Sequence, residues 1–375
     1  MVLNLYKKIK PYVISQKNRI AFYLGEREDM RFLSKHKYSQ LSNQEKKEID
    51  DYWANFGVKF PNYSWFEMYY EVTGIRDPRF IPDTFARFVL YPFYNDVKAY
   101  EGWVDKNFFD KFLGKDYIPL TLCHKFKGHF YDGDWNYYGQ NKIDVLAGFI
   151  ERKAGGDSVV VKDTRDSCAG VGVKIFSFKN RRDILDFLKS DTRGDFIIQK
   201  RLIQHPFFSQ FNKSSVNILR IISWKHDGKV DILSVSVRFG IQGSFTDVAY
   251  VNGQEIVNVV GVDSIGRIND RWIGFGGNST AIDIEMKEIP YFEETLNVVK
   301  EAHLKLPPFD VIGWDVTIDD ANNPIIIEYN VKRPGTILYQ FANGPLAGDY
   351  TSSLLSFLKD QNLKDRYLPK RYKLK

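Results

Sequence analysis

The sequence predicts an α+β fold built on antiparallel sheet, and two observations lead to that prediction. Short β-rich runs separated by turns occupy the chain from about residue 159 onward, and several of them read as hairpins. Helical segments over 180–190 and 291–305 interrupt these runs, and Asn180 with Asp183 gives the first of them an N-terminal capping pattern. The expected strands cover residues 159–162, 173–178, 195–200, 217–224, 229–240, 310–318 and 324–331.

The N-terminal part of the chain differs from the rest in residue composition and in its predicted secondary structure. Residues 43–56 have the pattern of an amphipathic helix. Aromatic residues make up 15% of the 375-residue chain and concentrate over 52–100, where four prolines divide the segment into short pieces. We expect three parts: a mainly helical, aromatic-rich region (1–100), a small α+β subdomain (101–205) and a larger one that ends in a helix (206–375).

Composition limits the class of protein. Hydrophobic residues at 43% and charged residues at 27% are ordinary for a folded globular chain. The net charge of +6 allows an anionic partner but does not require nucleic acid. Cys123 and Cys168 cannot form a disulfide framework and match no zinc spacing. No apolar stretch approaches the length of a membrane span and no signal peptide is visible, so we expect a soluble cytoplasmic protein.

The sharpest chemical signal is the C-terminal hairpin, which turns at the sequence DDANNP. Centring that turn pairs Ile318 with Ile325, Val316 with Ile327, Asp315 with Glu328, and Gly313 with Asn330. Two carboxylates directly opposite each other repel, and a divalent cation removes that repulsion. The hairpin therefore predicts a Mg²⁺ site at Asp315, Glu328 and Asn330, with a solvated face as the alternative.

Two lysines and a glycine loop suggest a phosphate site. Lys162 ends a strand, and the loop that follows it contains Gly170 and Gly172, which lets backbone N–H groups approach an anion. The loop is neither a Walker A loop nor a Rossmann fingerprint, and an ordinary turn is the alternative. Lys106, at the start of an expected helix, is a second candidate, and a solvated lysine is its alternative.

Two arginines lie on neighbouring β-rich runs. Arg220 shares a strand face with apolar residues, and Arg238 shares one with serines. Buried cations need anions, so each arginine either recognises a phosphate or carboxylate or forms an internal salt bridge.

Taken in order, these segments resemble the ATP-grasp superfamily, and more narrowly the sugar-transfer-associated ATP-grasp family. The resemblance covers roughly residues 78–340. It is carried by VDKNFFDKFL, VVVKDTRDSCAGVGV, IQHPFFSQFNKSSVNILRI, GWDVTID and IIEYNVKRPG. It implies an ATP-grasp fold, in which two α+β subdomains clasp ATP.

The resemblance also implies a role for each candidate residue. ATP would contact Lys106, Lys162, Ser167, Gly170, Gly172, Gln199, Lys200 and Leu202. The transferred phosphoryl group would contact Arg220, Arg238 and Arg333. Mg²⁺ would contact Asp315, Glu328 and Asn330. The chain departs from the family in two places: the adenine hinge lacks an acidic residue, and Thr246-Asp247-Val248 replaces the usual Val-Asp-Asn.

The activity that the resemblance implies is an ATP- and Mg²⁺-dependent carboxylate–amine ligase that works through an acyl phosphate. Its substrates would be a carboxylate and an amine from small molecules or glycans, such as a uronic acid or an amino acid joined to a sugar in surface polysaccharide biosynthesis. An ATP-dependent phosphotransferase on a sugar or glycan is the alternative within the fold. A non-enzymatic basic binding protein is the alternative outside it. The basic N-terminal stretch also allows peripheral association with a membrane-linked glycan, although such a stretch is more often simply a solvated helix.

Overall fold

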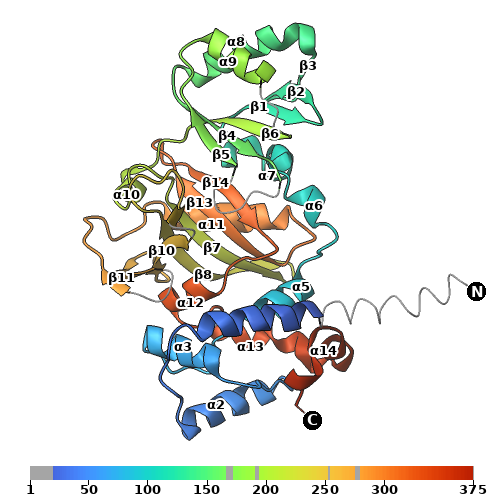
Figure 1. Ribbon diagram of the computed structural model, residues 1–375, viewed down its shortest axis with the longest axis vertical. Coiled ribbons are helices and arrows are strands. Elements are labelled where there is room, and N and C mark those ends of the chain that lie inside the picture. Colours follow the sequence, from blue (N-terminus) through green and yellow to red (C-terminus); the bar gives the residue numbers. More distant parts are fainter. Residues whose placement is uncertain (1–19, 166–171, 191–193, 252–253, 275–278, 375) are drawn as a thin grey trace, which may run out of the picture.

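The computed structural model describes residues 20–165, 172–190, 194–251, 254–274 and 279–374. Its long axis runs through three layers (Figure 1). A small sheet covered by α8 and α9 lies at one end, a larger sheet with α11 lies in the middle, and a layer of helices lies at the other end. The mixture of helices and antiparallel sheets confirms the predicted α+β class.

The small sheet has six strands in the order β3-β2-β1-β6-β4-β5. Its strands are β1 (Thr121–Phe126), β2 (His129–Asp132), β3 (Tyr137–Tyr138), β4 (Val159–Asp163), β5 (Val173–Phe176) and β6 (Phe196–Lys200). The helices α8 (Ile143–Ala154) and α9 (Arg181–Ser190) share an apolar core with one face of it. The Asn180 side chain accepts the Asp183 amide at 3.1 Å, so the predicted cap of α9 is confirmed.

The larger sheet follows the order β12-β11-β10-β8-β7-β13-β14, and β9 pairs separately with β10. Its strands are β7 (Ile218–His226), β8 (Lys229–Phe239), β9 (Val248–Val251), β10 (Gln254–Val262), β11 (Ile268–Gly274), β12 (Ser279–Ala281), β13 (Val311–Ile318) and β14 (Pro324–Asn330). One face packs on α11 (Phe292–Leu304) through a core that includes Leu219, Trp314 and Val299. The opposite face carries the polar residues described below.

The helical layer joins both ends of the chain. It contains a helix over residues 20–33, α2 (Asn43–Ala54), α3 (Ser64–Thr73), α4 (Asp83–Phe85), the π-helix η1 (Ala86–Leu90), α5 (Tyr91–Tyr94), α12 (Ile337–Asn343), α13 (Thr351–Leu354) and α14 (Gln361–Tyr367). Fully buried aromatic rings, among them Trp53, Tyr69, Phe80 and Phe85, form its core. The aromatic excess of the sequence is therefore largely a packing feature of this layer.

The remaining helical segments are short. They are α6 (Tyr100–Trp103), α7 (Phe109–Leu113), α10 (Pro206–Ser209) and the 3-10 turns η2 (Lys106–Phe108), η3 (Lys115–Tyr117), η4 (Gln140–Lys142), η5 (Gly348–Tyr350), η6 (Ser356–Lys359) and η7 (Lys370–Tyr372). Among the described helices, none is long and apolar enough to cross a membrane. The seven predicted strands and the helices predicted over 43–56, 180–190 and 291–305 are confirmed to within about two residues, whereas β1–β3 and β9–β12 were missed.

Candidate functional site

The β13–β14 hairpin brings the predicted carboxylates together. Asp315 pairs with Glu328 and Gly313 pairs with Asn330, as the turn-centred register predicts. A Cβ on Gly313 would lie 2.3 Å from the Pro334 carbonyl oxygen, so the chain beyond β14 packs directly on this glycine. Glu328 and Asn330 lie two residues apart on one strand and therefore share a face with Asp315.

Between Asp315 and the turn, the predicted pairing of β13 with β14 is wrong. Val316 pairs with Ile326, and Ile318 pairs with Pro324, one residue away from the partners expected for each. The cause is a β-bulge directly after Asp315, which inserts Ile327 as an extra residue on β14. The bulge lies next to the carboxylate pair and leaves that pair in its predicted register.

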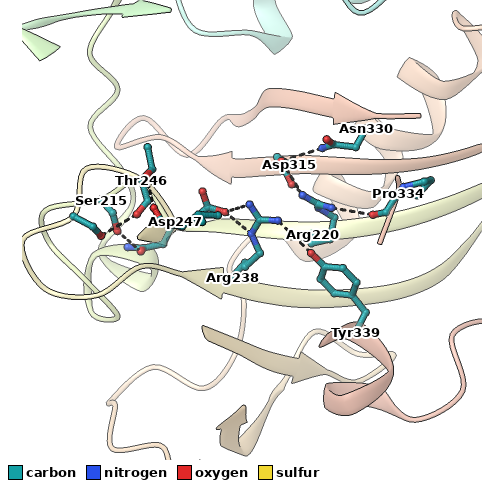
Figure 2. Close-up of polar contacts among 12 residues, drawn as sticks. Ser215, Arg220, Arg238, Thr246, Asp247, Asp315, Asn330, Pro334 and Tyr339 are labelled. Atoms are coloured by element: carbon teal, nitrogen blue, oxygen red, sulfur yellow. Dashed lines mark hydrogen bonds and ion pairs between the residues drawn. The ribbon is translucent and has the colours of Figure 1, made fainter. Parts of the chain in front are cut away.

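Asp315 also faces the neighbouring strand β7, where Arg220 is its register partner. The Arg220 guanidinium donates from Nε to Oδ1 at 2.5 Å and from Nη2 to Oδ2 at 3.0 Å (Figure 2). Arg220 Nη1 donates to the Pro334 carbonyl at 2.9 Å, and Asn330 donates to Asp315 Oδ2 at 3.2 Å. Of the two roles that the sequence allowed for Arg220, the internal salt bridge is therefore present. This salt bridge orients Asp315, one of the predicted Mg²⁺ ligands.

A second buried ion pair continues across the sheet. Arg238 on β8 binds the Asp247 carboxylate and donates from Nη1 to the Tyr339 hydroxyl at 3.3 Å (Figure 2). Burial raises the pKa of Asp247, while the charge of Arg238 opposes that rise. Sequence reasoning did not identify Asp247 as the partner of Arg238, because it lies on a connection between strands whose path no local pattern reveals.

Lysines from the small-sheet side reach the carboxylates of the larger sheet. Lys106 Nζ lies 3.8 Å from Glu328 Oε1. Burial raises the pKa of Glu328; Lys106 opposes the rise and Asp315 adds to it. Burial, and then the charge of Lys106, lower the pKa of Lys162 to about 8, while Glu328 acts in the opposite direction. Two cations and two carboxylates thus converge where the two sheets meet.

Backbone contacts fix Lys106 in place. The helix expected at Lys106 is the 3-10 turn η2 followed by α7, and Lys106 is the first residue of that turn. Asp105 caps the turn by accepting the Asn107 amide at 3.0 Å, and Arg165 binds the same carboxylate at 2.7 Å. The Lys106 amide donates to the Thr164 carbonyl at 3.1 Å, which ties the lysine to the end of β4.

The predicted adenine hinge lies at the end of β6. Gln199 is buried, and its side chain donates to the Pro119 carbonyl and to Thr121 at 3.3 Å. The Lys200 amide donates to the Leu120 carbonyl at 2.9 Å, and the Lys200 ammonium binds Asp157. Leu202, half-buried, follows beyond the strand end. These contacts leave the side chains of Gln199 and Lys200 engaged with the protein.

The remaining predicted residues divide into two groups. Ser167, Cys168 and Gly170 lie outside the described residues. Gly172 has φ +79°, and a Cβ there would lie 2.3 Å from the Asp163 carboxylate, so glycine is needed. Arg333 is exposed, and its charge acts on Asp83 of the helical layer.

The chemistry of this cluster fits Mg²⁺. The two opposed carboxylates and the Asn330 amide supply hard oxygen donors, and a divalent cation would offset the repulsion that helps to raise the pKa of Glu328. No group of three His, Cys, Asp or Glu side chains gathers within the part of the chain that the structure describes. Phosphate oxygens would therefore complete the coordination, as is usual for Mg²⁺ bound by one or two carboxylates.

Two sheets that face each other with lysines on one side and carboxylates on the other define an ATP-grasp fold. The model of the sugar-transfer associated ATP-grasp family matches residues 86–351. That range is more than half of the chain, so the chain belongs to this family, and both the resemblance and the fold predicted from it are confirmed.

Solved structures of the same fold are distant from this chain. The ATP-grasp ligase PsnB, complexed with a minimal precursor, is 13% identical with a TM-score of 0.39, and the match covers 70% of this chain and 63% of that one. D-alanyl-alanine synthetase A from Vibrio cholerae is 12% identical with a TM-score of 0.40, over 75% of this chain and 66% of that one. This chain therefore spans less than two thirds of the length of either protein. Comparison with curated proteins finds no match.

Proposed function

We propose that this protein is an ATP- and Mg²⁺-dependent ligase that joins a carboxylate to an amine through an acyl phosphate. The observation that carries the proposal is the 3.8 Å approach of Lys106 to Glu328, with Lys162 beside them. This arrangement suits a polyphosphate held between lysines on one side and a carboxylate-bound cation on the other. Membership in the ATP-grasp family supports the same reading.

Each residue of the cluster has a role in this proposal. Lys106 and Lys162 would neutralise the phosphates of ATP. Asp315, Glu328 and Asn330 would hold Mg²⁺, which supplies positive charge at the β- and γ-phosphates when bound. Arg220 positions Asp315 by its two-point contact.

Arg238 is the residue that we propose for the reacting phosphoryl group. A guanidinium has five N–H donors, and the contacts with Asp247 and Tyr339 use three of its nitrogens once each. The remaining donors would steady the charge of an acyl phosphate. Arg333, in the turn after β14, would reach the acceptor side of the same site.

The reaction has two steps with balanced atoms. A carboxylate oxygen of the first substrate attacks the γ-phosphorus of ATP, the bond to the β-phosphate oxygen breaks, and ADP leaves. The amine nitrogen of the second substrate then attacks the acyl carbon, phosphate leaves, and the nitrogen loses a proton. No side-chain nucleophile takes part. We further propose that the enzyme amidates a uronic acid or joins an amino acid to a sugar in surface polysaccharide biosynthesis; the association of the family with sugar transfer supports a sugar substrate.

Two experiments test this proposal in sequence. Thermal unfolding with ATP, ADP or GTP, each with and without Mg²⁺, tests for a nucleotide site, because a ligand that binds only the native state raises the melting temperature. A Mg²⁺-dependent rise with ATP that disappears in Asp315→Ala but persists in Asp320→Ala supports it. Asp320 is a matched control because it is exposed at the turn of the same hairpin.

Product analysis then separates the ligase from its alternatives. Release of phosphate and ADP only when both a carboxylate and an amine are present supports the ligase. Formation of ADP with a phosphorylated sugar and no free phosphate would establish a phosphotransferase instead. Absence of any nucleotide effect, with other binding unchanged in Asp315→Ala, would favour the non-enzymatic binding protein.

A further inference from the structure

The helix over residues 20–33 is anchored to the protein by one face only. Phe22 is buried and packs edge-on against Tyr372 at 4.9 Å between ring centroids. The Tyr372 hydroxyl donates to Glu26 at 2.6 Å, and Asp29 accepts from Arg87 at 2.5 Å. These contacts hold the helix in the helical layer, at the end of the molecule opposite α8 and α9 (Figure 1).

The outer face of this helix is apolar at its start and basic further along. Ile20, Tyr23 and Leu24 are 61%, 50% and 53% exposed, and Arg27 and Arg31 are exposed one and two turns later. These five residues follow the i, i+3, i+4 spacing of one helix face. We call them the outer face of the first helix.

Basic residues lie next to the apolar part of this face, and one of them, Arg371, forms an ion pair with Glu26. The guanidinium carbons of Arg27 and Arg371 lie 5.9 and 5.7 Å from the ring centroid of Tyr23. The sequence before the helix adds Lys7, Lys8, Lys10, Lys17 and Arg19, and the first acidic residue of the whole chain is Glu26. Glu28 is also exposed, between Arg27 and Arg31 on the same helix, so the described cations of this face outnumber its carboxylates by one.

We infer that the outer face of the first helix docks on the headgroup surface of a bilayer that contains anionic phospholipid. Apolar side chains on one helix face enter the boundary between headgroups and acyl chains, and neighbouring lysines and arginines bind anionic headgroups. A tyrosine between two guanidiniums suits that boundary, because its ring is apolar and its hydroxyl is polar.

Two other kinds of binding partner, a protein and a nucleic acid, fit the outer face of the first helix less well. A standard protein interface uses roughly 20–30 residues from each partner, and the apolar patch here has three. Nucleic acid would use the cations but would leave Ile20 and Leu24 in water. A lipid surface is the partner that uses both the charge and the exposed apolar side chains.

Co-sedimentation of the full chain with vesicles tests the inference. We expect binding to vesicles of phosphatidylglycerol and phosphatidylcholine, weaker binding at high salt, and little binding to phosphatidylcholine alone. The double variant Tyr23→Asp/Leu24→Asp should lower the partition coefficient roughly tenfold or more, because two apolar contacts become charges. The matched control is Val97→Asp/Ile265→Asp, whose side chains are 64% and 78% exposed elsewhere on the protein.

Several outcomes would overturn the inference. They are equal binding to neutral and anionic vesicles, equal loss of binding in the control variant, and absence of wild-type binding at low salt. A wild-type dimer that becomes monomeric in Tyr23→Asp/Leu24→Asp would show that a second copy covers the face. Should that variant melt at a lower temperature than the wild type, Arg27→Gln/Arg31→Gln decides the question: vesicle binding that these exposed substitutions leave unchanged overturns the inference.

Discussion

Glu328→Gln should separate the stability of the hairpin from its capacity to bind Mg²⁺ and ATP. The substitution keeps the shape of the side chain and removes one of two opposed negative charges. Relief of that repulsion is worth about 0.2–1 kcal/mol. Loss of the 3.8 Å contact with Lys106, on a side chain that is 29% exposed, costs about 0–1 kcal/mol. The two terms oppose each other, so the free energy of unfolding should change by less than about 1 kcal/mol.

Asp315→Ala provides the contrast. Arg220 is 5% exposed, and this substitution removes the carboxylate that binds two of its guanidinium nitrogens. Leaving a buried charge unpaired typically costs about 3–5 kcal/mol. Asp315→Ala should therefore lose both stability and nucleotide binding, whereas Glu328→Gln should lose only binding.

Urea unfolding with and without Mg²⁺ and ATP measures both quantities. At a ligand concentration one hundred times its dissociation constant, the wild type should gain about 2.7 kcal/mol, and Glu328→Gln should gain almost none. An undiminished gain in Glu328→Gln would remove Glu328 from the metal site. A loss of several kcal/mol without ligand would show that its contact with Lys106 is chiefly structural.

Three further substitutions test other parts of the site. Tyr91→Phe removes the 2.7 Å hydrogen bond to the Gly335 carbonyl and should lower the free energy of unfolding by about 0.5–1.5 kcal/mol in urea unfolding. The pKa of Lys162 in the folded chain, about 8, is below its ordinary value of 10.5, so the unfolded state binds more protons between these values. Stability should therefore rise with pH across that window, and Lys162→Met should reduce the rise measured by urea unfolding at successive pH values. Gly313→Ala places a Cβ 2.3 Å from the Pro334 carbonyl oxygen and should destabilise the chain by about 1–3 kcal/mol; an unchanged melting temperature would show that the turn after β14 moves freely.

The pairing of Asp315 with Glu328 could be predicted from sequence because counting residues outward from the turn of a hairpin gives the strand register. The chain between Asp315 and Glu328 contains one turn, and the period of two assigns faces on both strands. The same counting gave the wrong partners nearer the turn, because a β-bulge adds one residue to β14. The sequence carries no distinct signal for this bulge. Only the pairs on the turn side of the bulge were affected.

Contacts between segments that are not joined by a single turn could not be predicted by such counting. Strand β6 pairs with both β1 and β4, and the partner of Arg238 comes from a connection nine residues further along the chain. Such contacts depend on how separate segments pack together, which local propensity does not determine. The missed strands β1–β3 and β9–β12 are mostly short, and their pairing likewise depends on the rest of each sheet.

The aromatic-rich region, predicted only as a mainly helical part of the chain, also forms hydrogen bonds with the hairpin of the candidate site. Asn95 is 5% exposed and donates to the carbonyls of Val311 and Val331, at the start of β13 and just past the end of β14. It also accepts the amides of Asp310 and Val311 at 3.0 Å. A single buried side chain thus joins the two ends of the β13–β14 hairpin that lie away from its turn.

The family match begins at residue 86, so it includes Tyr91 and Asn95 but not the helices before them. The residues that hold the hairpin therefore lie inside the matched range, and the helix over 20–33, with its exposed outer face, lies outside it. The family match therefore includes the β13–β14 hairpin together with the buried residues that hold its ends, and the N-terminal helices lie before it.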